Sequence, residues 1–299
     1  MGFDMKPEKE VISRKNHCKA KNPSPNSVNS VSNKKQKKKK KTMLTSRPRM
    51  VDSTADEITP VRRLFDTCKQ VFSNGGPGIV PSLEKIQQLR DILDDMKPED
   101  VGLAPTMPYF RPNNNGAEDL SSPPITYLHL HQCEQFSIGI FCLPPSGVIP
   151  LHNHPEMTVF SKLLFGTMHI KSYDWVVDAP MRDPKTRLAK LKVDSTFTAP
   201  CNASILYPED GGNMHRFTAQ TACAVLDVLG PPYCDPYSDP EGRHCTYFLD
   251  FPFDKFSSAN GVVLRDEEKE GHAWLQERDD NPEDLNVVGA LYTGPNVED

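Results

Sequence analysis

The chain has 299 residues, of which 37% are hydrophobic, enough for one large domain or two small ones with a buried core. Its net charge of -5 conceals an asymmetry, because residues 1–50 carry 15 Lys and Arg against 3 Asp and Glu, and the rest of the chain therefore carries a net charge of -17. No apolar stretch reaches the roughly 18 residues that a membrane helix needs, and the N-terminus lacks the apolar region of a secretion signal. We therefore expect a chain that is neither secreted nor inserted into a membrane, with eight cysteines that stay reduced.

Residues 1–54 are predicted to form a disordered tail. They are rich in Lys, Asn, Ser and Pro and poor in aromatic residues, so they cannot bury enough apolar surface to offset the entropy lost on ordering. The run KKQKKKKK at residues 34–41 is typical of a nuclear import signal or of a merely solvated tail, and import would place the protein in the nucleus as well as the cytoplasm. Direct nucleic-acid binding is not expected, because no aromatic or structured element accompanies the lysines.

Residues 55–104 are predicted to form two helices. Thr59 is a candidate cap before a first-turn proline, and apolar residues recur at helical spacing from there until NGGPG ends the pattern. Ser82 is a candidate cap for a second helix that ends before Pro98. Both apolar faces predict packing against a core.

Residues 105–255 are predicted to form a β-sandwich or barrel. From about Ile125 the apolar period changes from 3.6 to 2, and the short runs, rich in β-branched and aromatic residues, are separated by Gly, Pro and Asp turns without intervening helices. The runs are ITYLHLH, FSIGIFCL, MTVFSKLLF, TMHIKSYDWVV, AKLKVD, STFTA, ASILYP, HRFTAQ, CAVLDVL and CTYFLDF. The charged residues 256–299 are expected to form an extension packed on or near this barrel.

Two histidines, His152 and His154, lie two residues apart between prolines. In an extended strand such residues point to the same face, so both imidazoles can be aimed at one metal ion. His215 is the best third ligand, because it follows a Gly-rich turn and shares its strand face with Phe217. His169 shares its face with polar residues and is expected to point to water.

A second histidine pair, His129 and His131, has the same spacing. No glycine or proline turn flanks this pair, and no third ligand is placed near it. A structural or pocket-lining role is therefore favoured over metal binding.

The sequence around His152 and His154 resembles the metal motifs of cupins. GVIPLHNHPEMTVFSKLLFG resembles the first motif and PEDGGNMH the second, and the residues at or near the expected places are Gly147, His152, His154, Gly166, Gly212 and His215. The resemblance implies a mainly β cupin double-stranded β-helix. Val159 occupies the usual acidic ligand position, and Glu156 is out of step with the motif, so the implied ligands are three neutral imidazoles. Such a set leaves the full charge of a divalent ion, which favours an anionic thiolate as a further ligand.

A longer stretch is similar to thiol dioxygenases, the family of cysteamine dioxygenase and, most closely, the plant cysteine oxidases. The matching text includes PPSGVIPLHNHPEMTVFSKLLFGTMHIKSYDW, LYPEDGGNMHRFTA, LDVLGPPY and SDPEGRHCTYF, and the similarity covers roughly residues 57–299. It implies that His152, His154 and His215 hold Fe(2+) and that O2 oxidises the N-terminal cysteine of target proteins to sulfinic acid. The oxidised proteins, such as hypoxia-response transcription factors, would then enter N-degron degradation. We expect a monomer.

Three further residues are candidates for catalysis. Asp227 interrupts the apolar run ACAVLDVLG, and burying a carboxylate costs free energy unless it is paired. It could hold a substrate ammonium group or manage a proton near the sulfur, or it could pair structurally with backbone or Arg216. Tyr233 and Tyr237 lie in the near copies YCDP and YSDP, so either could line the pocket or its rim, and the role of Cys245 is open.

Two other functions fit the same motifs. The chain could be a dioxygenase of a small free thiol such as cysteamine or cysteine, or a non-catalytic cupin binding module. Three-histidine sites also hold zinc. The retention of all three histidines favours an enzyme over a binding module.

Overall fold

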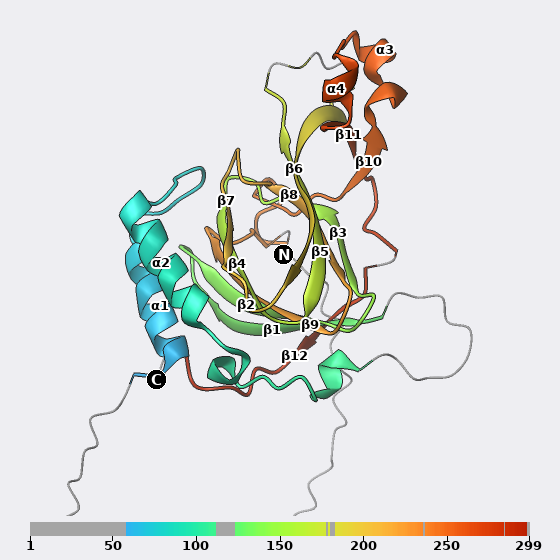
Figure 1. Ribbon diagram of the computed structural model, residues 1–299. Helices are drawn as coiled ribbons and strands as arrows, with labels where there is room; N and C mark the ends of the chain where they lie inside the picture. The colour runs from blue at the N-terminus through green and yellow to red at the C-terminus, as the bar shows by residue number, and fades with distance from the viewer. Residues whose placement is uncertain are drawn as a thin grey trace, which may run out of the picture. The chain divides into compact units, whose positions relative to one another are not determined.

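The computed structural model describes residues 58–111, 123–177, 179, 183–235, 237–283 and 285–297. The predicted tail with its lysine run lies outside these residues. The described chain consists of two N-terminal helices followed by strands that form two curved sheets around a common interior (Figure 1). Within the described part, no helix has the length and apolar character needed to cross a membrane.

Each sheet has six strands. The first has the order β12-β1-β2-β9-β4-β7 and the second the order β10-β11-β6-β5-β8-β3. The pairings are antiparallel except that of β1 with β12. This architecture confirms the predicted cupin barrel. The strands of the first sheet are β12 (Val287–Ala290), β1 (Ile125–Gln132), β2 (Ser137–Leu143), β9 (Cys223–Gly230), β4 (Thr158–Phe165) and β7 (Ser204–Leu206). Those of the second are β10 (Phe248–Pro252), β11 (His272–Glu277), β6 (Thr186–Thr198), β5 (Thr167–Trp175), β8 (Met214–Ala219) and β3 (Val148–His152).

The two predicted helices are present and cover the outer face of the first sheet (Figure 1). The side chain of Thr59 accepts from the N–H of Arg62 at 3.3 Å, and the side chain of Ser82 accepts from the N–H of Lys85 at 3.5 Å, so both predicted caps form. The helices are α1 (Pro60–Val71) and α2 (Leu83–Asp95), and the shorter helical turns are η1 (Pro98–Val101), η2 (Pro108–Phe110), η3 (Phe253–Lys255), α3 (Ser257–Asn260) and α4 (Asp266–Lys269).

The central strands β2, β9 and β4 are buried on both faces. Alternate residues such as Ile140, Phe160 and Leu226 pack with the helices, whereas Phe141 and Val225 belong to a cluster on the opposite face, inside the barrel. A strand covered on both faces needs apolar residues at nearly every position, which explains why β9 is apolar except at Asp227. The same alternation directs the side chain of Asp227 into the barrel, where it lines a pocket.

Three strands differ from the sequence expectation. AKLKVD and STFTA form one strand, β6, because Asp194 and Ser195 continue its pairing with β5. The C-terminal residues, which gave no clear strand pattern, contribute β11 beside β6 and β12 beside β1. The C-terminal part of the chain thus supplies one strand to each sheet. The seven cysteines described are free thiols, as predicted.

Candidate metal centre

The three predicted histidines converge inside the barrel. His152, His154 and His215 are buried, and their ligand atoms lie within 4.8 Å of one another, the only such group of His, Cys, Asp or Glu found among the described residues. His152 ends β3 and pairs with His215 on β8. His154 follows the end of β3 in a turn, and is not in the strand as the spacing argument assumed. The turn nevertheless aims its ring at the same point.

Hydrogen bonds fix which nitrogen the rings of His152 and His154 present to the metal site. The Nδ1 atom of His152 donates to the carbonyl of Pro150 at 2.8 Å. Tyr233 donates its hydroxyl proton to the carbonyl of Asn153 at 2.7 Å. Because that proton is used, the hydroxyl oxygen accepts the second hydrogen bond, at 2.8 Å, from the Nδ1–H group of His154. Both rings therefore carry a lone pair on Nε2, as a metal-binding histidine requires.

The Nε2 atoms of His154 and His215 lie 3.4 Å apart. A cation between them would be within reach of both nitrogens. Burial lowers the pKa of His152 to about 4 and, with the neighbouring histidines as a further cause, lowers the pKa values of His154 and His215 well below their usual range. The imidazoles are thus neutral at pH 7 and free to act as ligands, so this donor set fits a divalent metal ion.

No carboxylate belongs to this cluster. Val159, at the usual acidic ligand position, is buried on β4, and Glu156 is exposed with a left-handed φ of 59°. A metal ion held by the three histidines alone keeps its full charge.

Asn213 joins the two metal motifs. Its side chain accepts from the N–H of His154 at 3.0 Å and donates to the carbonyl of His154 at 2.8 Å. Asp174 in turn accepts from the backbone N–H groups of Gly212 and Asn213 at 2.8 and 3.0 Å. Gly212 has a φ of 87° and lies so close to Ser172 that a Cβ atom would meet its hydroxyl at 2.4 Å. Sequence reasoning missed Asp174 and Asn213, because their partners are backbone groups distant in sequence.

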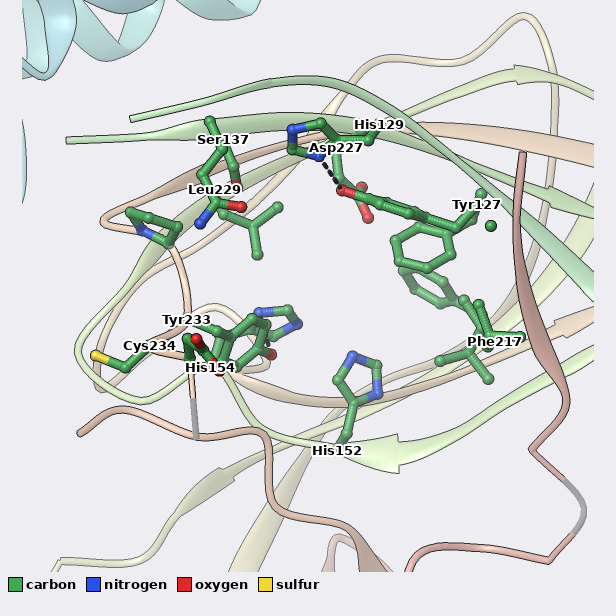
Figure 2. Close-up of a pocket in the computed structure, with 18 of the residues that line it drawn as sticks. Tyr127, His129, Ser137, His152, His154, Phe217, Asp227, Leu229, Tyr233 and Cys234 are labelled. Carbon is green, nitrogen blue, oxygen red and sulfur yellow. Dashed lines mark hydrogen bonds between the residues drawn. The ribbon is translucent and has the colours of Figure 1, made fainter. Parts of the chain in front are cut away.

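A pocket of about 590 Å³ opens onto the histidines (Figure 2). The histidines line one side, and Asp227 lies across the open space from them beside Tyr127 and His129. The pocket reaches the surface at exposed residues, which are His129, Gln132, Asp235, Gly289 and Leu291. Four of its lining residues come from β12 and the position after it, and they are Val287, Gly289, Ala290 and Leu291.

Asp227 is the one carboxylate buried in this pocket among the described residues. Burial raises its pKa to about 7, opposed by a hydrogen bond from the side chain of Ser161. Its Oδ1 atom has no hydrogen-bond partner in the described structure. The described ion pairs do not include one between Asp227 and Arg216, whose side chain is exposed on β8. Asp227 is therefore placed to act on a bound ligand.

The structure separates the two candidate tyrosines. Tyr233 is buried in the pocket wall and hydrogen-bonds the metal-binding segment, and burial raises its pKa well above the usual range. Tyr237 is 82% exposed and is not among the residues that line the pocket. Cys245 lies near Tyr233 and Tyr247, and burial raises the pKa of its thiol to about 11.

Three further histidines of the described chain, His129, His131 and His169, lie outside the cluster. His129 lines the pocket, 3.5 Å from the hydroxyl of Tyr127, whereas His131 packs against the rings of Phe65 and Phe136. His169 is partly exposed and contacts Asp194 at 2.8 Å. These positions agree with the pocket-lining or structural roles expected for the second pair.

The fold and the cluster together define a cupin with three histidines that could hold a metal ion. The PCO_ADO family model matches residues 92–297. Plant cysteine oxidase 1 of Arabidopsis thaliana is 79% identical over 304 residues, which cover 100% of both chains. Plant cysteine oxidase 2 of the same species is 65% identical over 81% of this chain and 84% of its own length. The 2-aminoethanethiol dioxygenase of Mus musculus is 30% identical over 82% of this chain and 98% of its own length.

The chain therefore belongs to the PCO_ADO family of iron-dependent thiol dioxygenases. The three-histidine cluster agrees with this family's metal requirement.

Proposed function

We propose that the chain uses Fe(2+) and O2 to oxidise the N-terminal cysteine of target proteins to cysteine sulfinic acid. The observation that carries this proposal is the pocket of about 590 Å³ that joins the three histidines to the surface. A volume of this size is typical of sites for ligands much larger than cysteamine or free cysteine. The first residues of a peptide can occupy it with the cysteine sulfur at the inner end.

His152, His154 and His215 are the proposed iron ligands, through their Nε2 atoms. Iron held by these residues would supply the redox chemistry that lets the thiolate react with O2. In the overall reaction both atoms of O2 become bonded to sulfur, which gives up four electrons, and the thiol proton is released. No external reductant is required.

Asp227 is proposed to act directly on the bound cysteine. Its carboxylate lies across the pocket from the histidines, where it can accept a hydrogen bond from the substrate's α-ammonium group or take up the thiol proton (Figure 2). A pKa raised to about 7 suits exchange of a proton near neutral pH. Phe141, Phe217 and Leu229 line the same space and exclude water from the reacting atoms.

The targets are proposed to include hypoxia-response transcription factors, which would be degraded through the N-degron pathway when O2 is abundant. The similarity to plant cysteine oxidases supports this assignment. The lysine run at residues 34–41 supports a location in the nucleus as well as the cytoplasm. We propose that the enzyme acts as a monomer.

The test is anaerobic reconstitution with Fe(2+), followed by O2 and a peptide that begins with cysteine, with the peptide mass as the readout. A gain of two oxygen atoms that disappears when the N-terminal amine is acetylated supports the proposal. Oxidation of cysteamine or cysteine without oxidation of the peptide would instead assign a small thiol. Failure to oxidise any of them would leave a non-catalytic cupin.

A further inference from the structure

A second, smaller cavity lies next to the metal pocket inside the barrel. Its volume is about 100 Å³. Its walls come from β4, β5, β6, β7, β8 and β9 and from the segments beside β7, and they expose more apolar than polar surface. The apolar side chains include those of Val159, Leu163, Met168, Ile170, Val193 and Val225, and the polar ones are those of Ser161, Ser172, Asn202, Ser204 and His215. Small cavities with apolar walls in proteins take up apolar molecules such as xenon.

The two cavities share a wall. His215 and Phe217 line both, and their rings are stacked with centroids 4.5 Å apart and planes at 7°. Ser161 lines the small cavity, and its hydroxyl bonds Asp227, which lines the metal pocket. A single layer of side chains thus separates the small cavity from the metal pocket, and one of those side chains is a proposed iron ligand.

The cavities reach the surface at different places. The small cavity ends at Phe197, which is 36% exposed, and at the exposed residues Asn202 and Ser204. The metal pocket ends beside Asp235 and Leu291. A peptide seated in the metal pocket therefore leaves the mouth of the small cavity uncovered.

We propose that the small cavity binds O2 and delivers it to the metal centre. The proposal rests on the proposed function, which makes O2 a substrate of the adjoining site. O2 is small and apolar, so it partitions from water into a cavity whose walls are mainly apolar. A displacement of the Phe217 ring, which contacts both spaces, joins them. O2 can then arrive while the peptide occupies the main pocket.

The first test fills the cavity at Val193, a half-buried residue of β6 that lines it. Val193→Trp should raise the KM for O2 about threefold or more and change the KM for the peptide and kcat at saturating O2 by less than about twofold. Thr196→Trp is the matched control, because it adds the same ring to the same strand at an exposed position that does not line the cavity. Its KM for O2 should equal that of the wild type. Ile170→Phe provides a second, smaller filling of the cavity should Val193→Trp fail to fold.

The second test uses xenon as the probe and needs no turnover. Crystals of the iron-loaded protein under xenon pressure should show the gas between Val193 and Phe217 in the wild type and not in the filled variant. An empty cavity in the wild type, or an unchanged KM for O2 in filled variants that retain iron, would overturn the proposal. Failure of the wild type to oxidise the peptide at saturating O2 would instead overturn the proposed function, whatever the xenon result.

Discussion

The side-chain amide of Asn213 binds both the N–H and the carbonyl of His154. Because Asn213 is two residues before His215, this pair of hydrogen bonds ties the backbone of one metal motif to that of the other. The spacing between the two histidines therefore depends on a residue that does not itself touch the metal pocket.

We expect Asn213→Ala to weaken iron binding by about 10- to 100-fold, as is usual when groups that orient metal ligands are removed. The measurement is titration of the metal-free protein with Fe(2+) under anaerobic conditions. Gln220→Ala, which removes an exposed amide just beyond β8, serves as the control and should bind iron as the wild type does. Equal affinities in both variants would contradict the role of Asn213.

Removal of a proposed ligand should abolish both metal and activity. His215→Ala is expected to purify without iron and to leave a cysteine peptide unoxidised after reconstitution. His169→Ala removes a partly exposed imidazole from the neighbouring strand. This variant should keep both its iron and its activity. Metal analysis together with peptide mass spectrometry distinguishes these outcomes, and stoichiometric iron in His215→Ala would show that the ligand set is different.

Asp227→Asn should separate metal binding from chemistry. The amide has nearly the same shape but can neither carry the negative charge nor accept a proton, so iron content should be unchanged while kcat falls by about 100-fold or more. Steady-state kinetics on the peptide, normalised to bound iron, provide the measurement. The role given to Asp227 would be abandoned if this variant turned over at the wild-type rate.

The raised pKa of Asp227 also predicts a pH-dependent stability. Its folded-state pKa of about 7 exceeds the unfolded value, so the folded protein binds this proton more tightly, and the wild type loses stability as pH rises from about 4 to about 7. Asp227→Asn lacks this titration. The unfolding free energy of this variant minus that of the wild type should therefore increase by up to about 4 kcal/mol as the pH rises from about 4 to about 7. Above about pH 7 the difference should stay constant.

Urea unfolding of both metal-free proteins between about pH 4 and about pH 8 measures this difference, because the titrations of all other groups cancel between them. A difference in unfolding free energy that does not vary with pH would show that the carboxyl titrates normally.

The two tyrosines should differ in their effect on the metal. Tyr233→Phe removes the oxygen that accepts from His154 Nδ1, so the ring loses the hydrogen bond that orients it, and iron affinity should fall by about tenfold. Tyr237→Phe removes an exposed hydroxyl outside the pocket and should bind iron normally. Iron titrations of the two variants provide the measurement. Equal iron affinities would refute the role of Tyr233 in orienting His154.

The sequence predicted the elements whose signals are local. Thr59 and Ser82 cap their helices through contacts within three residues, and Asp227 stands out because a charge interrupts an apolar strand. The histidine cluster could be predicted since spacing and a Gly-rich turn mark all its members. Strand β12 could not be predicted, because its four residues include a glycine and show no alternation of apolar and polar side chains. Tyr233 and Tyr237 occupy near copies of one motif, and only the fold distinguishes the buried ring from the exposed one.

The late position of β12 in the chain has a consequence for biosynthesis. This strand pairs with β1, more than 150 residues earlier in the sequence, and contributes to the wall of the metal pocket. A nascent chain on the ribosome therefore lacks part of that wall until β12 has emerged from the exit tunnel. The pocket is completed only after synthesis has passed this strand, so a prematurely terminated chain leaves the edge of β1 open to other strands.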